Sequence, residues 1–217
     1  MIEEQLDKTK DDIIRERLLL TAMQEFMQYG FSRISMDDLA VKMGMSKKTL
    51  YKYYLSKEEL VKAVLELRKS KVAELMSFIE TKVPKHAFGE KIVQVSQKVA
   101  AFLSEIHPHV MYDLKKSFPL IFDDFDTFRK ASIVKGFTIA LNEGRASGVF
   151  RDDIPIELAV HMHLTLISTM MNPEYLANQQ FTPLQVFNMI LRCTMEGLCT
   201  NKGRSIVEAS LFTKPVL

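Results

Sequence analysis

Apolar residues recur every three or four positions through most of the 217-residue chain, which is the period of an amphipathic helix. Near the N-terminus this pattern predicts a helix from Asp11 to Tyr29, with acidic residues in its first turn and Gly30 at its end. Its apolar positions are Ile14, Leu18, Ala22, Phe26 and Tyr29. The sequence shows no strand alternation, internal repeat or low-complexity tract, so we predict an all-α fold.

Two short helices are predicted next, each opened by a serine that can cap the helix N-terminus. Ser35, followed three residues later by an aspartate, predicts a helix from Met36 that ends before Gly44. Ser46 predicts another helix from Lys47 to Tyr53. The two helices and the turn between them form a tight unit.

A long fourth helix is predicted from the capping box Ser56-Lys-Glu-Glu59. It meets no breaker before Pro84, so it could extend over about 26 residues, or about 39 Å, enough to connect two domains. Further helices are expected before Pro108, Gly148 and Pro173, and from the capping box Thr182-Pro-Leu-Gln185 to about Thr200. Residues after Gly203 are predicted to form a loose tail.

The two short helices have the residue spacing of a helix-turn-helix. Ala40 is small enough for two helices to cross closely, Gly44 can adopt a left-handed turn, and Leu50 can anchor the second helix. At 100° per residue, Lys48 and Lys52 lie opposite Leu50, with Thr49 and Tyr51 on the flanks. The exposed face is therefore expected to be cationic and aromatic, which suits a DNA groove.

The composition indicates the class of protein, and the distribution of charged residues shows where its positive charge lies. With 47% hydrophobic and 26% charged residues, and with neither a membrane-length apolar run nor a secretory signal, we expect a compact, soluble, cytoplasmic protein without a membrane partner. A net charge of +2 does not by itself indicate a polyanion partner. The charge is uneven, however: no acidic residue lies between Asp38 and Glu58, whereas that stretch contains Lys42, Lys47, Lys48, Lys52 and Lys57.

The N-terminal motifs resemble those of TetR-type transcriptional regulators over residues 11–64. The matching residues are Phe26, Gly30-Phe31, Ser35-Met-Asp-Asp-Leu-Ala40, Gly44-Met-Ser-Lys-Lys-Thr-Leu-Tyr51, Tyr53 and Ser56-Lys-Glu-Glu-Leu60. The resemblance implies a three-helix DNA-binding domain (1–57) joined by a long helix to a larger ligand-binding and dimerisation domain (58–217). It also implies that Lys47, Lys48, Thr49 and Tyr51 approach base edges, that Tyr53 and Lys57 hold phosphates, that Lys52 can do either, and that Ser35 and Thr49 can hydrogen-bond phosphate.

The chain contains 14 phenylalanines and 13 methionines, and many of them lie between Phe78 and Met171. Flexible thioethers and flat rings open an apolar cavity more readily than interlocked branched side chains, and the resemblance implies a small-molecule pocket here. We expect it among Phe102, Met111, Phe122, Phe137 and Met162, with Tyr112, His163 and Tyr175 as polar orienting groups.

Other chemistry has weaker support in the sequence. The pairs His107/His109 and His161/His163 are two residues apart, which on a helix directs them to different faces, so no metal site or cofactor is expected. Of the second pair, one is expected at the surface and one as a satisfied interior group. Asp123, Asp124 and Asp126 are interpreted as acids before a helix rather than a catalytic pair. None of the common hydrolase, zinc-protease or nucleotide-binding motifs occurs.

These patterns together predict a transcriptional regulator, not an enzyme, that binds a palindromic DNA operator as a homodimer and is released by a small apolar or amphipathic effector. Repression is the expected output. Residues 158–171 are apolar around most of the helix circumference, which favours dimerisation through the last two helices. Two alternatives remain: an architectural or cell-division factor of the same fold without ligand control, and an all-α enzyme.

Overall fold

The computed structural model describes residues 9–107 and 109–211. Regular structure in these residues is helical, with a single isolated β-bridge between Phe150 and Cys199, so the all-α prediction is confirmed. The helices are α1 (Lys10–Tyr29), α2 (Met36–Lys42), α3 (Lys47–Tyr53), α4 (Lys57–Glu80), a 3-10 turn η1 (Lys85–Ala87), α5 (Phe88–Ser104), α6 (Val110–Ser117), α7 (Pro119–Ala146), α8 (Ile156–Met170), α9 (Pro173–Ala177), α10 (Pro183–Leu198) and α11 (Asn201–Leu211).

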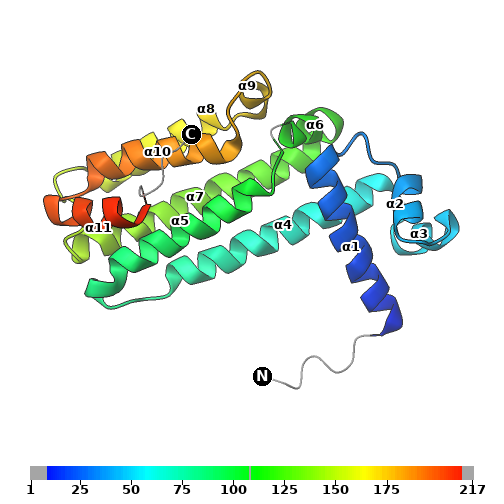
Figure 1. The fold of residues 1–217 in the computed structure, drawn as a ribbon, viewed down its shortest axis with the longest axis horizontal. Coiled ribbons are helices and arrows are strands. Elements are labelled where there is room, and N and C mark those ends of the chain that lie inside the picture. The colour runs from blue at the N-terminus through cyan, green and yellow to red at the C-terminus, as the bar shows by residue number, and fades with distance from the viewer. Residues whose placement is uncertain (1–8, 108, 212–217) are drawn as a thin grey trace.

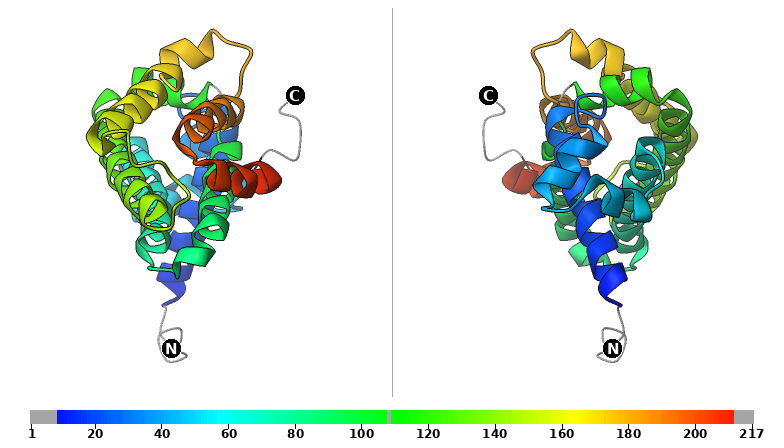
Figure 2. Two further views of the ribbon diagram at one scale, coloured as in Figure 1. Left: turned by 90° about the vertical axis from the view of Figure 1, so that its left-hand side faces the viewer. Right: turned by 90° about the vertical axis from the view of Figure 1, so that its right-hand side faces the viewer.

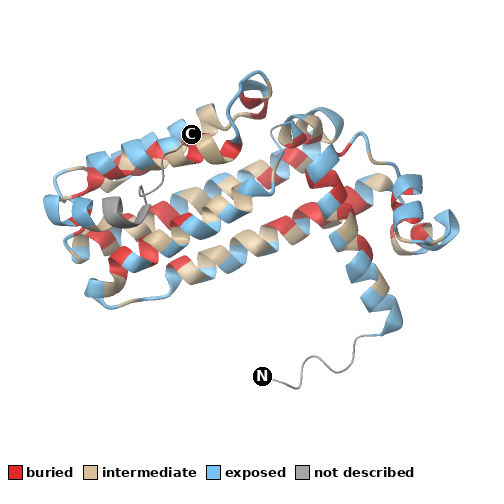
Figure 3. Ribbon diagram, in the orientation of Figure 1, coloured by how far each residue is buried: buried red, intermediate tan, exposed pale blue. Residues whose placement is uncertain are grey.

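The long helices lie side by side along the length of the molecule, and short helices occupy its two ends (Figures 1 and 2). α1 crosses α4 near the end that carries α2 and α3, whereas α11 lies at the opposite end (Figure 1). Buried residues follow the inward faces of the long helices (Figure 3). Within the described part of the chain, none of the helices is both long enough and apolar enough to span a membrane.

Local capping contacts explain why several helices begin where the sequence predicts. The Ser35 and Thr182 side chains both form complete capping boxes with the third residue of their helices. The box predicted at Ser56 is wrong in one half. The Ser56 hydroxyl accepts the Glu59 N–H at 3.1 Å, but the Glu59 carboxylate accepts the N–H of Leu55 at 2.8 Å, one residue too early.

One hydrophobic core joins the N-terminal helices to the rest of the molecule. Leu18 of α1, Leu39 of α2 and Leu50 of α3 are buried together with Val61 of α4 and Leu114 of α6. The first half of α4 therefore packs as part of the N-terminal unit, and the core runs through the predicted boundary at residue 57. α4 then continues along the larger helical part, where it packs extensively against α7.

The far end of the molecule is closed by α11, so the predicted loose tail after Gly203 is wrong. Gly203 lies so close to the Val149 carbonyl that a Cβ at this position would overlap it. The Thr200 hydroxyl donates to the Gly148 carbonyl at 2.8 Å and accepts the Gly203 N–H at 3.0 Å. The sequence pattern missed α11 because a close backbone approach of this kind depends on a glycine rather than on an apolar repeat.

At this end of the molecule, a buried lysine holds the C-terminal end of α4 in place. Lys91 of α5 is only 5% exposed, and its ammonium donates at 2.7 Å both to the Thr81 carbonyl and to the Glu143 carboxylate of α7. A buried ammonium is stable only when such partners replace its lost hydration. Lys91 therefore ties the end of α4 to α5 and α7.

Candidate nucleic-acid interface and ligand cavity

α2 and α3 form a helix-turn-helix with a left-handed glycine in the turn. Gly44 has φ +64°, a region that favours glycine, and the Met45 N–H donates to the Ala40 carbonyl at 3.0 Å across the turn. Ala40 and Leu50 are both buried where the helices cross. Their predicted roles as small crossing residue and anchor are confirmed.

The outer face of α3 is exposed and basic. Lys47, Lys48, Thr49 and Lys52 are all exposed, whereas Leu50 is fully buried on the opposite face of this short helix. Tyr51 is half-buried, with the Lys47 ammonium 6.0 Å from the centre of its ring. The predicted orientation of these side chains is thus observed, while their contact with DNA stays a prediction.

Carboxylates that the sequence analysis did not anticipate hold part of this basic face. Asp11 of α1 accepts from the Tyr53 hydroxyl at 2.8 Å and from the Lys52 ammonium at 3.2 Å. The Tyr53 hydrogen bond, together with the Lys52 charge, lowers the pKa of Asp11, and Asp11 in turn raises the pKa of Lys52. Lys47 pairs in the same way with Asp37 of α2 at 2.9 Å. Spacing along the chain could not reveal the Asp11 contacts, because they join residues about forty positions apart.

The remaining predicted phosphate contacts lie at the edges of the unit. The Ser35 hydroxyl donates to the Asp38 carboxylate at 2.6 Å, so its proton is already used within the α2 cap. Lys57 donates to the Ser32 carbonyl at 3.2 Å, and partial burial lowers its pKa. The Ser32 N–H donates in turn to the Asp113 carboxylate of α6 at 2.7 Å. Asp113 therefore connects the larger helical part directly to the α1–α2 loop.

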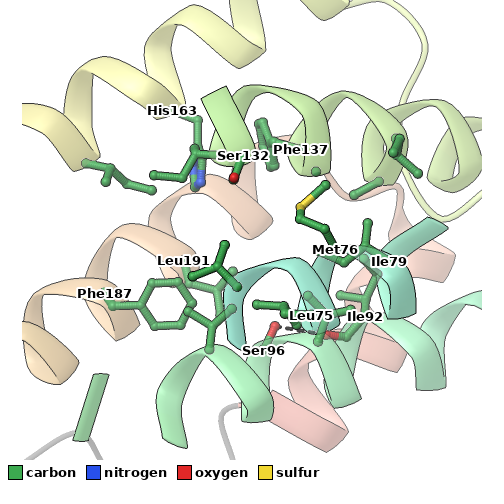
Figure 4. A pocket seen from close by; sticks show the side chains of 18 of the residues that line it. Leu75, Met76, Ile79, Ile92, Ser96, Ser132, Phe137, His163, Phe187 and Leu191 are labelled. Carbon is green, nitrogen blue, oxygen red and sulfur yellow. Dashed lines mark hydrogen bonds between the residues drawn. The ribbon is translucent and has the colours of Figure 1, made fainter. Parts of the chain in front are cut away.

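An apolar cavity of about 210 Å³ lies among the long helices (Figure 4). Its walls come from α4, α5, α7, α8 and α10, including Met76 and Ile79 of α4, Ile92 of α5 and Leu191 of α10. Of the lining positions on α4 and α5, the sequence analysis placed only Phe102 in the pocket, and it treated the others as plain helix faces or did not name them. Their apolar period was visible in the sequence, but the period does not show which faces leave space between them.

Few polar groups border the cavity, and most are already paired. Lys91 and Glu143 pair with one another, and Arg129 donates to Asp126 at 2.6 Å. The hydroxyls of Ser96 and Ser132 donate to carbonyls within their own helices, each at 2.9 Å. His163 differs from these groups: it is 7% exposed, and its Nδ1 has no hydrogen-bond partner among the described residues.

The predicted pocket residues do not all meet at this cavity. Phe102, Phe137 and His163 line it. Met111 and Phe122 pack with the N-terminal core, and Tyr112, Met162 and Tyr175 are exposed at the surface. The prediction used phenylalanine and methionine content, which marks buried surface in general and not one particular cavity.

The predictions for the histidine pairs and for the acidic cluster also need correction. His161 is exposed and His163 buried, as expected, but the interior histidine is not satisfied. His107 and His109 precede α6 rather than lying on a helix, and their rings are 5.6 Å apart instead of on different faces. Asp123, Asp124 and Asp126 lie inside α7, where Asp126 pairs with Arg129 and Lys130. Among the described residues no group of three or more His, Cys, Asp or Glu side chains could hold a metal ion.

α8 and α10 carry large apolar side chains on their outer surface. Leu158, Met162 and Leu166 of α8 are spaced four residues apart and are 51%, 56% and 41% exposed. Met189 of α10 is 55% exposed. A row of this kind on one helix face is typical of a surface that packs against a further partner.

Comparison with known proteins agrees with this geometry. The family described as "Bacterial regulatory proteins, tetR family" matches residues 18–64, which include α2 and α3. The HTH-type transcriptional regulator YvaF of Bacillus subtilis (strain 168), itself uncharacterised, is 29% identical over 187 residues, covering 86% of this chain and 96% of that protein.

Solved structures share the whole fold at low sequence identity. A TetR-family regulator from Agrobacterium tumefaciens has a TM-score of 0.64 at 15% identity, covering 87% of this chain and 98% of that one. The regulator FadR from Bacillus subtilis, solved in complex with stearoyl-CoA, has a TM-score of 0.58 at 18% identity, covering 84% and 98%. The described N-terminal helices match the family motif, and the long helices match the family fold. Residues 18–64 therefore match the tetR family of bacterial regulatory proteins, and the chain as a whole resembles solved TetR-family regulators in its fold.

Proposed function

We propose that this regulator is a homodimeric repressor whose residues 1–57 bind a palindromic operator and whose residues 58–217 dimerise and bind a small apolar effector. The observation that carries the proposal is the position of α4. Its first half belongs to the N-terminal core, and its second half, with Met76 and Ile79, forms a wall of the cavity. A ligand in the cavity therefore touches the helix that supports the DNA-binding unit.

The basic face of α3 would enter the major groove, as the second helix of a helix-turn-helix does. In the proposed complex Lys47, Lys48, Thr49 and Tyr51 approach base edges, and Lys52, Tyr53 and Lys57 contact phosphate. Ser35 joins them only after its hydroxyl releases the Asp38 carboxylate. Asp11 and Asp37 hold Lys52 and Lys47 in the free protein through exposed ion pairs. Such pairs are weak in water, so phosphates can replace the carboxylates.

The contacts of Arg68 form a second connection between the cavity wall and α4. Arg68 of α4 is 1% exposed, and it donates to the Glu105 carboxylate at 2.6 Å and to the Phe102 carbonyl at 3.3 Å. Its guanidinium lies 3.7 Å from the centre of the Phe102 ring, which itself lines the cavity. A ligand that displaces this ring also disturbs the contacts that hold Arg68, and so shifts α4.

DNA binding can be tested with lysine variants on an operator selected from random duplexes. Lys48→Ala should relax sequence preference and weaken operator binding, because a base contact is worth about 1–3 kcal/mol. Lys57→Ala should weaken binding to all sequences alike and lower the salt slope by about one. Lys202→Ala, at the opposite end of the molecule, is the control. If Lys57→Ala changed the preferred operator instead, its assignment to phosphate would be wrong.

Dimerisation can be tested by light scattering at micromolar concentration. We expect a mass of about 50 kDa, twice the 24.9 kDa of one chain. Leu166→Glu on the exposed face of α8 should produce monomers, whereas Leu120→Glu, at an 81% exposed position of α7, should not. A monomer of the unmodified chain would refute the proposed interface.

Effector control makes a reciprocal prediction. A ligand that weakens operator binding by a given factor must bind more weakly to the operator complex by the same factor, since both report one coupling free energy, typically about 1–3 kcal/mol. Cavity ligands found by thermal-shift screening can be titrated with and without saturating operator. Equal affinities would remove the sensor function and leave a DNA-binding factor without ligand control.

A further inference from the structure

Among the described residues that line the cavity, one buried polar side chain has a nitrogen without a hydrogen-bond partner, the Nδ1 of His163. The imidazole of His163 stacks on Phe137 with ring centres 4.0 Å apart and an interplanar angle of 18°, which fixes its orientation. Figure 4 shows the ring entering from α8, with its nitrogen-bearing edge toward the space between the helices. A buried polar group without a partner is costly, and such groups often mark a place where a ligand supplies the partner.

The charge around the cavity indicates what kind of partner fits. The charged residues of the lining, Lys91, Arg129 and Glu143, are each engaged in an ion pair within the protein. Burial lowers the pKa of His163 to about 4, so its ring is neutral near pH 7. An ionised ligand group would therefore lose its hydration without gaining a counter-charge, which disfavours carboxylates and amines at this position.

The hydrogen-bonding capacity of the neutral imidazole further restricts the functional group that the ligand can place beside His163. A neutral imidazole has one N–H donor and one bare nitrogen acceptor. A hydroxyl group can both donate and accept, so it can pair with Nδ1 whichever nitrogen carries the proton. The hydroxyls of Ser96 and Ser132 already donate to helix carbonyls and can only accept a further bond.

The size of the cavity limits the apolar part of the ligand. Its volume of about 210 Å³ exceeds the roughly 150 Å³ of an engineered apolar cavity that binds benzene. There is room for one ring with a short alkyl chain, or for an aliphatic chain of similar volume. We infer that the effector is a small uncharged alcohol or phenol whose hydroxyl hydrogen-bonds His163 while its apolar body fills the cavity. This inference rests on the proposed effector role of the cavity.

The test uses the full chain and three probes that share one apolar body: para-propylphenol, propylbenzene and para-propylbenzoate. Calorimetric titration near neutral pH should show the phenol binding about 3- to 10-fold more tightly than propylbenzene, the effect of one net hydrogen bond, and the anion binding most weakly. His163→Phe should bring the phenol-to-propylbenzene ratio to about one, because the apolar walls remain. His163→Gln keeps a donor and an acceptor and should retain part of the preference.

His161→Ala, at an exposed position of the same helix, is the matched control and should keep the full preference. Thermal unfolding of each variant checks that it is folded. Tightest binding by the anion, a phenol preference that survives in His163→Phe, or no binding of any probe at millimolar concentration would overturn the inference.

Operator binding is measured separately with each probe, so that the two proposals can fail independently. If the phenol binds through His163 but leaves operator affinity unchanged, the ligand chemistry stands and the sensor function fails. If another class of molecule releases the operator while the phenol does not bind, the sensor function stands and this inference fails.

Discussion

Replacing Asp113 should loosen the contact between α6 and the α1–α2 loop. The Asp113 carboxylate accepts the Ser32 N–H at 2.7 Å, and Asp113 and Ser32 are 81 positions apart in the chain. A hydrogen bond to a charged group contributes about 1.5–3 kcal/mol, but Ser32 is exposed and water can take the place of the carboxylate. We therefore expect Asp113→Ala to cost about 1 kcal/mol of local stability, a factor of about five.

Amide hydrogen exchange at Ser32 measures this loss directly, because local opening governs the exchange of a protected amide. In Asp113→Ala the Ser32 amide should exchange about five times faster, and in Asp113→Asn, which retains a neutral acceptor, the increase should be smaller. The Gly30 amide, which donates to the Phe26 carbonyl at 2.9 Å within the end of α1, should change little. Lys116→Ala, an exposed position on α6, is the control. Unchanged exchange at Ser32 in Asp113→Ala would refute the reasoning.

Three further predictions concern the DNA-binding face, the far end and the buried histidine. Asp11→Asn should tighten DNA binding by up to about fivefold, because Lys52 then reaches phosphate without first leaving a carboxylate; unchanged affinity would show that the Asp11 ion pair does not compete with DNA. Gly203→Ala should lower the free energy of unfolding in urea by about 2–4 kcal/mol, because the new Cβ overlaps the Val149 carbonyl; a loss under about 0.5 kcal/mol would contradict this close approach. His163 has a folded pKa of about 4 against 6.5 in the unfolded chain, so the unfolded state binds more protons between these values. Stability should then fall as pH drops from about 6.5 to 4, by up to about 3 kcal/mol, and His163→Phe should remove this part of the pH dependence.

The helix-turn-helix was predictable because its determinants are local. Ser35 and Ser46 cap helices that begin at the next residue, and Gly44 ends a helix by adopting a left-handed conformation. Each determinant acts over three or four residues, so it can be identified from spacing alone. The Ser56 box was only half correct because the Glu59 carboxylate accepts the N–H of Leu55 instead of that of Ser56, and residue spacing does not distinguish these two adjacent amides.

The cavity and the acidic partners were not predictable in the same way. Asp11 reaches Lys52, and Asp113 reaches Ser32, only after helices distant in the chain have packed. The cavity likewise depends on where neighbouring helix faces fail to fill the space between them. The apolar pattern identifies many buried residues, although Met162 is exposed, and Phe122 and Phe137 show that it does not identify which core a buried residue joins.

The fixed C-terminal end of α4 makes this helix a lever with its pivot at the Lys91 contacts. Between that pivot and Lys57 lie 24 helical residues, an arm of about 36 Å. A rotation of only about 5° at the pivot displaces the N-terminal end of α4 by about 3 Å. Opposite rotations in the two protomers of the proposed dimer change the separation of their helix-turn-helix units by up to about 6 Å. Half-sites on DNA repeat at a fixed spacing of about 34–36 Å. In the proposed mechanism, a small ligand that rotates α4 in both protomers would therefore move the two helix-turn-helix units out of register with the operator.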